Sequence, residues 1–269
     1  MTNTTFQASC LRAQLRLMMP SAESKNMTRS NYTLISLRER EVEGESGSQD
    51  RQCVLYMQSS HPTFTLGVQQ VMVTDDKVPG ELAVSVLTRE VERAWAGFST
   101  QTCRTELTAE GLHIESLRTR REDGTYEGTP VKELKVRGTE VQLDGLPRKI
   151  EADAVLMDMV PLLDGLRAAV EIASTRGNGL KQQGVRITLS PTCLCIEGEN
   201  PIVNATTHYE GQWLQAPEET RTCLITTDAV RHLIAAFSAY GVGLPVRFAY
   251  KDHQLTVQCD NVTIICDVN

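Results

Sequence analysis

The chain has 269 residues, of which 41% are hydrophobic and 23% charged, and its formal net charge is −7. This composition is typical of a soluble globular protein with room for two domains. The acidic balance excludes a protein whose whole surface binds nucleic acid, although it allows local basic patches.

The sequence predicts neither a secretory signal nor a membrane span. Arg12, Gln14 and Arg16 interrupt the N-terminal segment, and no window reaches the roughly 18–20 apolar residues that a membrane helix needs. Eight cysteines are scattered along the chain, and Cys193 and Cys195 form the only close pair. We therefore expect buried, reduced thiols, no metal and no cofactor. The expected location is the cytoplasm of a bacterial or phage-infected cell, or the nucleus if the protein is eukaryotic.

The first half, residues 1–138, is predicted to hold two strand–helix–strand units. A strand and a helix fall within Thr4–Met19, and a strand over Asn31–Leu37 follows. The stretch Arg38–Arg51 is rich in Glu, Gly and Ser and predicts a solvated turn or loop. The remaining expected elements are strands over 53–58, 64–73 and 81–86, a helix capped by Thr88, and strands over 102–108, 112–117 and 131–136.

The second half, residues 150–269, follows a predicted linker over 139–149 that has glycine, proline and only isolated apolar residues. A helix starts near Asp158, with Pro161 in its first turn, where the missing N–H costs nothing. A second helix starts at Thr226-Thr227-Asp228. Each helix follows a short strand and precedes three more strands, the last of which ends near Val268.

Strand, helix and three-strand meander thus occur four times, as two pairs. The segment 10–17, CLRAQLRL, is similar to 165–172, GLRAAVEI, at an offset of 155 residues (165 − 10). The other two helices match at an offset of 139 residues (227 − 88), which aligns Thr88, Val91 and Phe98 with Thr227, Val230 and Phe237. We interpret the pattern as a duplication that gives two α+β domains, each with two helices on one face of antiparallel sheets.

Arginine recurs on the predicted outer faces of the four helices. Taken singly, such a charge usually only solvates a helix, and Glu90, Glu92 and Glu171 lie on the same helices. Recurrence on equivalent helices favours a surface that holds a phosphate backbone without reading base sequence. The candidate DNA-binding residues are Arg12, Arg16, Arg89, Arg93, Arg167 and Arg231.

At this level the chain resembles a known family. The second half, from DMVPLLDGLRAAVEIAS through GVRITLSPTCLCIEGEN to VRFAYKDHQLTVQCDNVTIICDV, is similar to one domain of a DNA sliding clamp, in particular the bacterial β clamp. The first half resembles the same domain with a longer insertion. The resemblance implies an α+β fold of two tandem clamp domains. Clamps are rings of six such domains lined by basic helices, so two domains per chain imply a homotrimer, whereas the three-domain bacterial clamp closes as a dimer.

The resemblance also implies partners. These are double-stranded DNA bound without sequence preference, a DNA polymerase and a clamp loader. Clamps recruit polymerases through an apolar groove beside the interdomain linker and the C-terminal strand. In this sequence that groove would involve Val141, Leu143, Leu146 and Val268.

An enzyme is not expected, because the five histidines are dispersed and no Walker, G-x-S-x-G, H-E-x-x-H or G-x-G-x-x-G motif occurs. The stronger alternative is a clamp-like protein that does not encircle DNA, such as a checkpoint-type clamp subunit or a monomeric processivity factor. The mass in solution distinguishes a ring of three 29.8 kDa chains from a single chain.

Overall fold

The computed structural model divides the chain into two compact units. Unit 1 comprises residues 1–61 and 67–144, and unit 2 comprises residues 62–66 and 145–269. The structure describes residues 2–7, 14–19, 31–43, 49–72, 82–96, 102–108, 110–116, 119–120, 126–127, 133–138, 150–173, 184–200, 202–239 and 243–268. The predicted linker at 139–149 lies outside these residues, so its limits stay a prediction.

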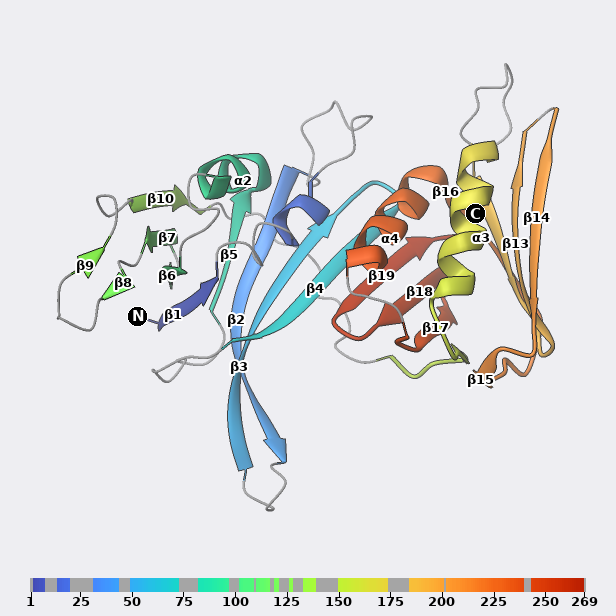
Figure 1. Cartoon of the computed structure of the whole chain (residues 1–269), viewed down its shortest axis with the longest axis horizontal. Coiled ribbons are helices and arrows are strands. Elements are labelled where there is room, and N and C mark those ends of the chain that lie inside the picture. Colours follow the sequence, from blue (N-terminus) through green and yellow to red (C-terminus); the bar gives the residue numbers. More distant parts are fainter. Residues whose placement is uncertain are drawn as a thin grey trace. The chain divides into compact units, whose positions relative to one another are not determined.

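Unit 1 consists of antiparallel strands, one helix and one helical turn (Figure 1). One sheet has the order β1-β6-β7-β10, and the strands of the other that belong to unit 1 run β4-β3-β2-β5. The elements are β1 (Thr2–Gln7), a helical turn at 14–17, β2 (Tyr32–Glu43), β3 (Gln49–Ser60), β4 (Phe64–Met72), β5 (Leu82–Leu87), α2 (Thr88–Ala96), β6 (Thr102–Thr108), β7 (Gly111–Ser116), the small pair β8 (Thr119–Arg120) and β9 (Tyr126–Glu127), and β10 (Glu133–Arg137).

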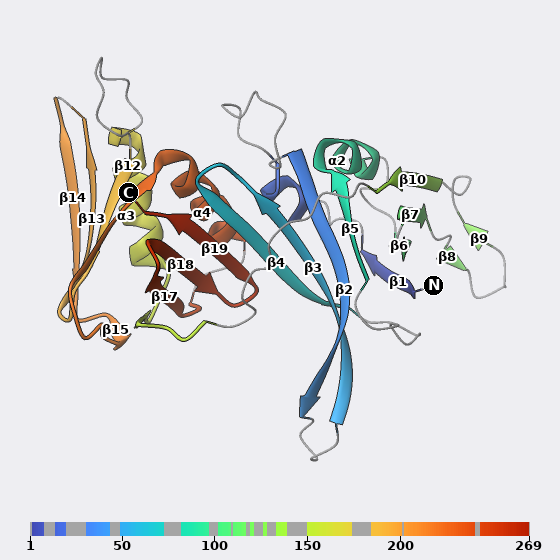
Figure 2. The ribbon, with the colours of Figure 1, turned by 180° about the vertical axis from the view of Figure 1, so that it is seen from behind.

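Unit 2 has the same kind of layers, and its two helices lie side by side (Figures 1 and 2). One sheet has the order β14-β13-β12-β16, and the other runs β15-β11-β17-β18-β19, followed by the first residues of β4. The elements are β11 (Ala154–Leu156), α3 (Val160–Ala173), β12 (Gly184–Leu189), β13 (Cys193–Glu199), β14 (Asn204–Glu210), β15 (Trp213–Gln215), β16 (Arg221–Thr226), α4 (Thr227–Ala239), β17 (Val246–Lys251), β18 (Gln254–Cys259) and β19 (Val262–Asp267).

Strand pairing shows the duplication directly. In unit 2, β11 pairs with β17 and β12 pairs with β16, so each strand–helix–meander segment lends a strand to the sheet of the other. In unit 1, β1 pairs with β6 and β2 pairs with β5, which is the same exchange between the equivalent strands. The two halves of the chain therefore share one connectivity, as the repeat in the sequence predicts.

Burial follows the same repeat. On the first helix of each half, Leu15 and Val170 are separated by the predicted offset of 155 residues, and they expose 0% and 6% of their surface. On the second helix of each half, Val91 and Val230 are both fully buried. Thr88 begins α2, and its hydroxyl donates to the backbone carbonyl of Asn31 at 3.0 Å. The apolar stripe of each helix thus supplies the core between helix and sheet.

The solvated turn or loop predicted over Arg38–Arg51 is wrong for residues 38–43 and 49–51, which belong to strands. Strands β2 and β3 continue through most of it, with Arg38 opposite Val54 and Glu43 opposite Gln49 (Figure 2). The register places Glu41 opposite Arg51, and residues 38–43 are charged at every position except Val42. Composition alone indicated a loop because strand pairing, and not an apolar face, holds this ribbon together.

Two glycines set how closely α3 approaches β13. A Cβ added at Gly165 of α3 would meet Ile196 Cδ1 at 2.6 Å, and one at Gly198 of β13 would lie 2.7 Å from Ala169 Cα and overlap the Ala169 carbonyl. Backbone atoms cannot move aside as a flexible side chain can. Gly198 is therefore required for the packing of α3 on its sheet.

We predict that Gly198→Ala lowers the free energy of unfolding by about 1–3 kcal/mol, because the added methyl group forces α3 away from β13. Urea denaturation followed by circular dichroism measures the loss. Glu199→Ala, at the exposed next position of the same strand, is the control and should change stability little. Equal stability of the two variants would show that α3 does not pack this closely.

Candidate nucleic-acid interface

Five of the six candidate arginines lie on exposed positions of the helical segments. Arg16 is on the helical turn at 14–17, Arg89 and Arg93 are on α2, Arg167 is on α3, and Arg231 is on α4. Arg12 lies outside the described residues. The sequence therefore placed these five side chains correctly on the solvent sides of their helices, because the apolar period fixes which side is buried.

Arginine on the first helical segment of each unit reaches toward the second helix. In unit 1, Arg16 Nε lies 3.4 Å from Glu92 Oε1 of α2. In unit 2, Arg167 Nη1 contacts Asp164 Oδ1 at 3.2 Å, and its Nη2 donates to Ser238 Oγ of α4 at 3.0 Å. Exposed ion pairs of this kind contribute about 0–1 kcal/mol, so a phosphate can replace the carboxylate at little cost.

Acidic residues balance the arginines on these helices. Helix α2 carries Glu90 and Glu92 beside its two arginines, α3 carries two acids against one arginine, and α4 has Asp228 in its first turn. Within the described residues, Arg89, Arg93 and Arg231 have no ion-pair partner. Any attraction for phosphate thus comes from individual exposed guanidinium groups and not from a net positive helix.

Three of the four predicted partner-binding residues, Val141, Leu143 and Leu146, lie outside the described part of the chain. The fourth, Val268, is half-buried, and its N–H donates to the His253 carbonyl at 2.9 Å. The C-terminal segment is therefore held against the β17–β18 turn.

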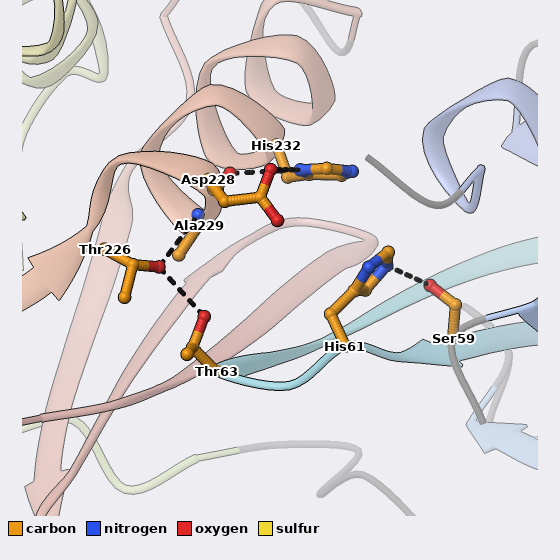
Figure 3. Close-up of polar contacts among 7 residues, drawn as sticks. All are labelled: Ser59, His61, Thr63, Thr226, Asp228, Ala229 and His232. Carbon is orange, nitrogen blue, oxygen red and sulfur yellow. Dashed lines mark hydrogen bonds and ion pairs between the residues drawn. The ribbon is translucent and has the colours of Figure 1, made fainter. Parts of the chain in front are cut away.

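Residues 62–66 belong to unit 2, which the sequence did not predict. The Thr63 carbonyl accepts the Asp267 N–H at 3.0 Å, and the Thr63 hydroxyl lies 2.9 Å from that of Thr226 (Figure 3). The ring of Phe64 packs against His232 with centroids 4.8 Å apart. Pro62 interrupts the strand pattern and was the only local sign that the chain changes unit here. An apolar strand pattern alone does not predict which sheet the strand joins.

The N-terminus of α4 next to Thr63 is fixed by local hydrogen bonds. Thr226 Oγ1 accepts the Ala229 N–H at 3.3 Å, as an N-cap side chain does. His232 Nδ1 lies 3.0 Å from the Asp228 carbonyl and 3.7 Å from Asp228 Oδ1 (Figure 3). These contacts hold the His232 side chain against the first turn of α4, and its ring packs on Phe64.

Burial raises the pKa of every described group whose ionisation is clearly shifted. It raises the pKa of Cys223 and Cys259 to about 11 and that of Cys266 to about 12. The pKa of Cys195 is raised by burial and then by the Glu197 carboxylate, and that of Tyr209 by burial and then by Asp164. These groups stay protonated at neutral pH, whereas a nucleophilic thiolate needs a lowered pKa.

Cysteines 53, 193, 195, 223, 259 and 266, whose side chains the structure describes, form no disulfide bond. Among the described residues, no cluster of three or more His, Cys, Asp or Glu side chains is arranged to hold a metal. None of the helices in the described ranges is long and apolar enough to cross a membrane.

The architecture is that of the DNA sliding clamps, and the solved structures that match it confirm the predicted α+β clamp fold. One is the Helicobacter pylori beta clamp bound to a DNA ligase peptide, with 12% identity, a TM-score of 0.69, and coverage of 99% of this chain and 66% of that chain. Another is the DNA polymerase III subunit beta from Pseudomonas aeruginosa, with 10% identity, a TM-score of 0.72 and coverage of 99% and 64%.

The DNA polymerase III beta subunit from Thermotoga maritima is similar at 11% identity, with a TM-score of 0.71 and coverage of 100% of this chain and 64% of that one. The chain thus spans about two thirds of the length of these structures. No protein-family model and no curated protein matches the sequence. At identities this low, the comparison shows that this chain and the matched structures share a fold.

We predict that the fully buried Cys266 thiol makes the protein less stable in alkali. The unfolded thiol ionises near pH 9.0 and the folded one near 12, so the stabilisation is complete below pH 9 and is lost as the pH rises toward 12. At pH about 10.5 the loss should be on the order of 2 kcal/mol. Urea denaturation at neutral and alkaline pH measures this loss.

The Cys266→Ala variant should lose correspondingly less stability between the two pH values. Its control is Cys193→Ala, which removes a half-exposed thiol and should keep the alkaline loss of the unmodified protein. An alkaline loss that is the same in all three proteins would show that Cys266 is not the group responsible.

Proposed function

We propose that this protein is a DNA sliding clamp, a polymerase processivity factor that encircles duplex DNA and tethers the replication machinery to it. The observation that supports this most strongly is the presence of two units of one connectivity in a chain whose whole length matches bacterial clamps in fold. A topological link needs no tight DNA site, which fits a chain with exposed arginines but no net positive helix.

The proposed assembly is a homotrimer. A ring of six clamp domains requires three copies of a chain that supplies two. The matched bacterial chains are longer, and this chain spans 63–66% of them, the share that two of three similar domains would occupy. The number of copies thus follows from the number of units per chain.

The proposed DNA contacts are made by Arg12, Arg16, Arg89, Arg93, Arg167 and Arg231. Guanidinium groups bind phosphate oxygens without reading bases, and such contacts weaken steeply as salt rises. Surface ion pairs such as Arg16–Glu92 exchange readily for phosphate because they are solvated. Several weak contacts of this kind would let a closed ring slide.

The proposed protein partners are a DNA polymerase and a clamp loader, with Val141, Leu143, Leu146 and Val268 as the docking residues. The Helicobacter pylori clamp was solved with a DNA ligase peptide bound. That complex supports recruitment through a short peptide segment of the partner. Val268 contributes from a C-terminal segment that is held in place by the hydrogen bond to His253.

A second candidate is a clamp-like protein that does not encircle DNA, such as a checkpoint-type clamp subunit or a monomeric processivity factor. The balance of acids and arginines on α2, α3 and α4 favours it, because a ring lining benefits from a net positive charge. In this case a purified protein would have the mass of one 29.8 kDa chain when alone.

We predict that changing Arg89→Glu together with Arg93→Glu weakens binding to a short blunt duplex. The change removes two phosphate contacts and adds repulsion, so the slope of log affinity against log salt should become shallower by about 2. Fluorescence anisotropy of a labelled duplex at several salt concentrations measures this slope.

The matched control is Arg186→Glu with Arg221→Glu, which changes the net charge equally on strands β12 and β16. Binding and slope should change less in this control. If both double variants lose DNA binding to the same extent, the DNA contact is a property of net charge and the helical arginines are not the interface.

A further inference from the structure

Strand β15 is an open edge of the second sheet of unit 2. It ends the order β15-β11-β17-β18-β19, and no described strand pairs with its outer side. The Met157 N–H, directly after β11, donates to the Gln212 carbonyl at 2.9 Å. Hydrogen bonding alternates along an antiparallel strand, so the N–H and C=O groups of the next residue, Trp213, point away from β11 toward the open side.

Two large apolar side chains are exposed beside this edge. Leu156 lies opposite Trp213, and the Trp213 ring packs edge-on against Phe248 with centroids 6.2 Å apart. Successive residues of a strand point to opposite faces, so Met157 and Leu214 lie together on the other face of the sheet. They expose 53% and 62% of their surface and are two of the four exposed large apolar residues in the described part of the chain.

The indole group of Trp213 lacks a hydrogen-bond acceptor. Its Nε1 is buried and has no partner among the described residues. A buried N–H without an acceptor is unfavourable, and the N–H of a buried tryptophan usually has one. Because Trp213 belongs to the edge strand, a chain that adds outside β15 brings backbone carbonyl groups next to this ring. A bound segment could therefore supply the missing acceptor.

The segment that carries β15 is acidic. Glu210, Glu218 and Glu219 are exposed on its two sides. The chain between β12 and β16 contains no lysine or arginine. The next arginine, Arg221, is paired with Glu219 at 2.9 Å, and Arg247 is half-buried on β17, two strands from the edge. A partner at this edge therefore gains from basic side chains.

We propose that β15 is the docking edge for an extended basic segment of a partner protein, which adds antiparallel to β15 as a further strand of this sheet. The residue of the segment opposite Trp213 exchanges backbone hydrogen bonds with it. The two residues beside that one are aliphatic and cover Leu214 and Met157. Lysine or arginine at the ends of the segment lies near Glu210 and Glu218. Strand addition of this kind derives affinity from main-chain hydrogen bonds and specificity from alternate side chains.

This docking edge goes beyond the proposed function, because it is separate from the residues proposed to bind a polymerase. Val268 follows β19, which is at the opposite end of the order β15-β11-β17-β18-β19 within unit 2. The basic segment therefore belongs to a further partner, and its binding does not depend on whether the protein encircles DNA.

The probe that tests this edge is the fluorescein-labelled peptide Lys-Lys-Val-Thr-Val-Lys-Lys, whose central threonine would lie opposite Trp213. One matched peptide has glutamate in place of every lysine. Another carries an N-methyl group on the central threonine, which removes the N–H that is donated to β15. Fluorescence anisotropy with the full chain measures each dissociation constant. Both matched peptides should bind at least about tenfold more weakly than the probe.

The apolar part of the edge is tested by Leu214→Asp, which places a charge where the aliphatic residues of the probe would pack. This variant should bind the probe at least about tenfold more weakly. Its matched control is Ile202→Asp, which introduces the same charge at a residue that is 91% exposed and lies outside this edge. The control should bind the probe as the unmodified protein does.

The acidic part is tested by Glu210→Lys with Glu218→Lys, which should reverse the preference so that the glutamate peptide binds more tightly than the probe. Glu171→Lys with Glu199→Lys changes the net charge equally at exposed positions on α3 and β13. This control should keep the preference for the lysine peptide. Circular dichroism confirms that all four variants remain folded.

Three outcomes would overturn the docking edge. The probe does not bind the unmodified protein, or the N-methyl group does not weaken its binding, in which case no strand is added. Alternatively, the control variants lose as much binding as the edge variants, which would show that the peptide is attracted by net charge alone. None of these results depends on DNA, so the docking edge and the proposed function can fail separately.

Discussion

The reciprocal exchange of strands between neighbouring strand–helix–meander segments is the interaction on which each unit depends. In unit 2, β11 leaves its own meander to pair with β17, and β12 pairs with β16. Because neither segment completes its sheets alone, the two must fold together. The exchange also brings α3 and α4 side by side, where Leu166 and Phe237 are fully buried. The same exchange in unit 1, through β1–β6 and β2–β5, makes the two units variants of one design.

A consequence of this design is that the outer faces of the helices carry no core residues. The side chains there contribute little to stability and are free to serve binding. Arg16 and Arg167 contact acidic partners at 3.4 and 3.2 Å, which holds them in place without burying them. For the proposed clamp, such weakly held cations suit a protein that must contact phosphate and still move along it.

Much of the fold could be predicted from the sequence because the apolar period is strong where helices meet sheets. Thr88 and Thr227 each begin a helix, as predicted, and the valine three residues after each of them is buried. The predicted offset of 139 residues between these two helices is therefore confirmed. The ribbon around Glu41 and Arg51 was missed because both of its faces are polar, so its pairing leaves no apolar signature. Which sheet a strand joins, as at Thr63, depends on contacts distant in sequence.

The candidate site could be predicted only in part, for a related reason. The helical period predicted which arginines face outward. It did not predict the ion pairs that Glu92 and Asp164 form with two of them, because side-chain rotamers and the positions of neighbouring helices determine these pairs. The position of β14 at the end of the order β14-β13-β12-β16 could not be predicted, because an edge strand and a central strand share the same alternation.

Retention on circular DNA tests the central claim most directly. The unmodified protein would be placed on a nicked circular duplex by a clamp loader, one of the proposed partners. It would then be washed with salt high enough to remove phosphate contacts, and the circle would be cut once. The account predicts that the protein stays on the circle through the wash and leaves after linearisation, because only a topological link survives the salt. Loss in the wash, or equal retention on circular and linear DNA, would contradict an encircling clamp.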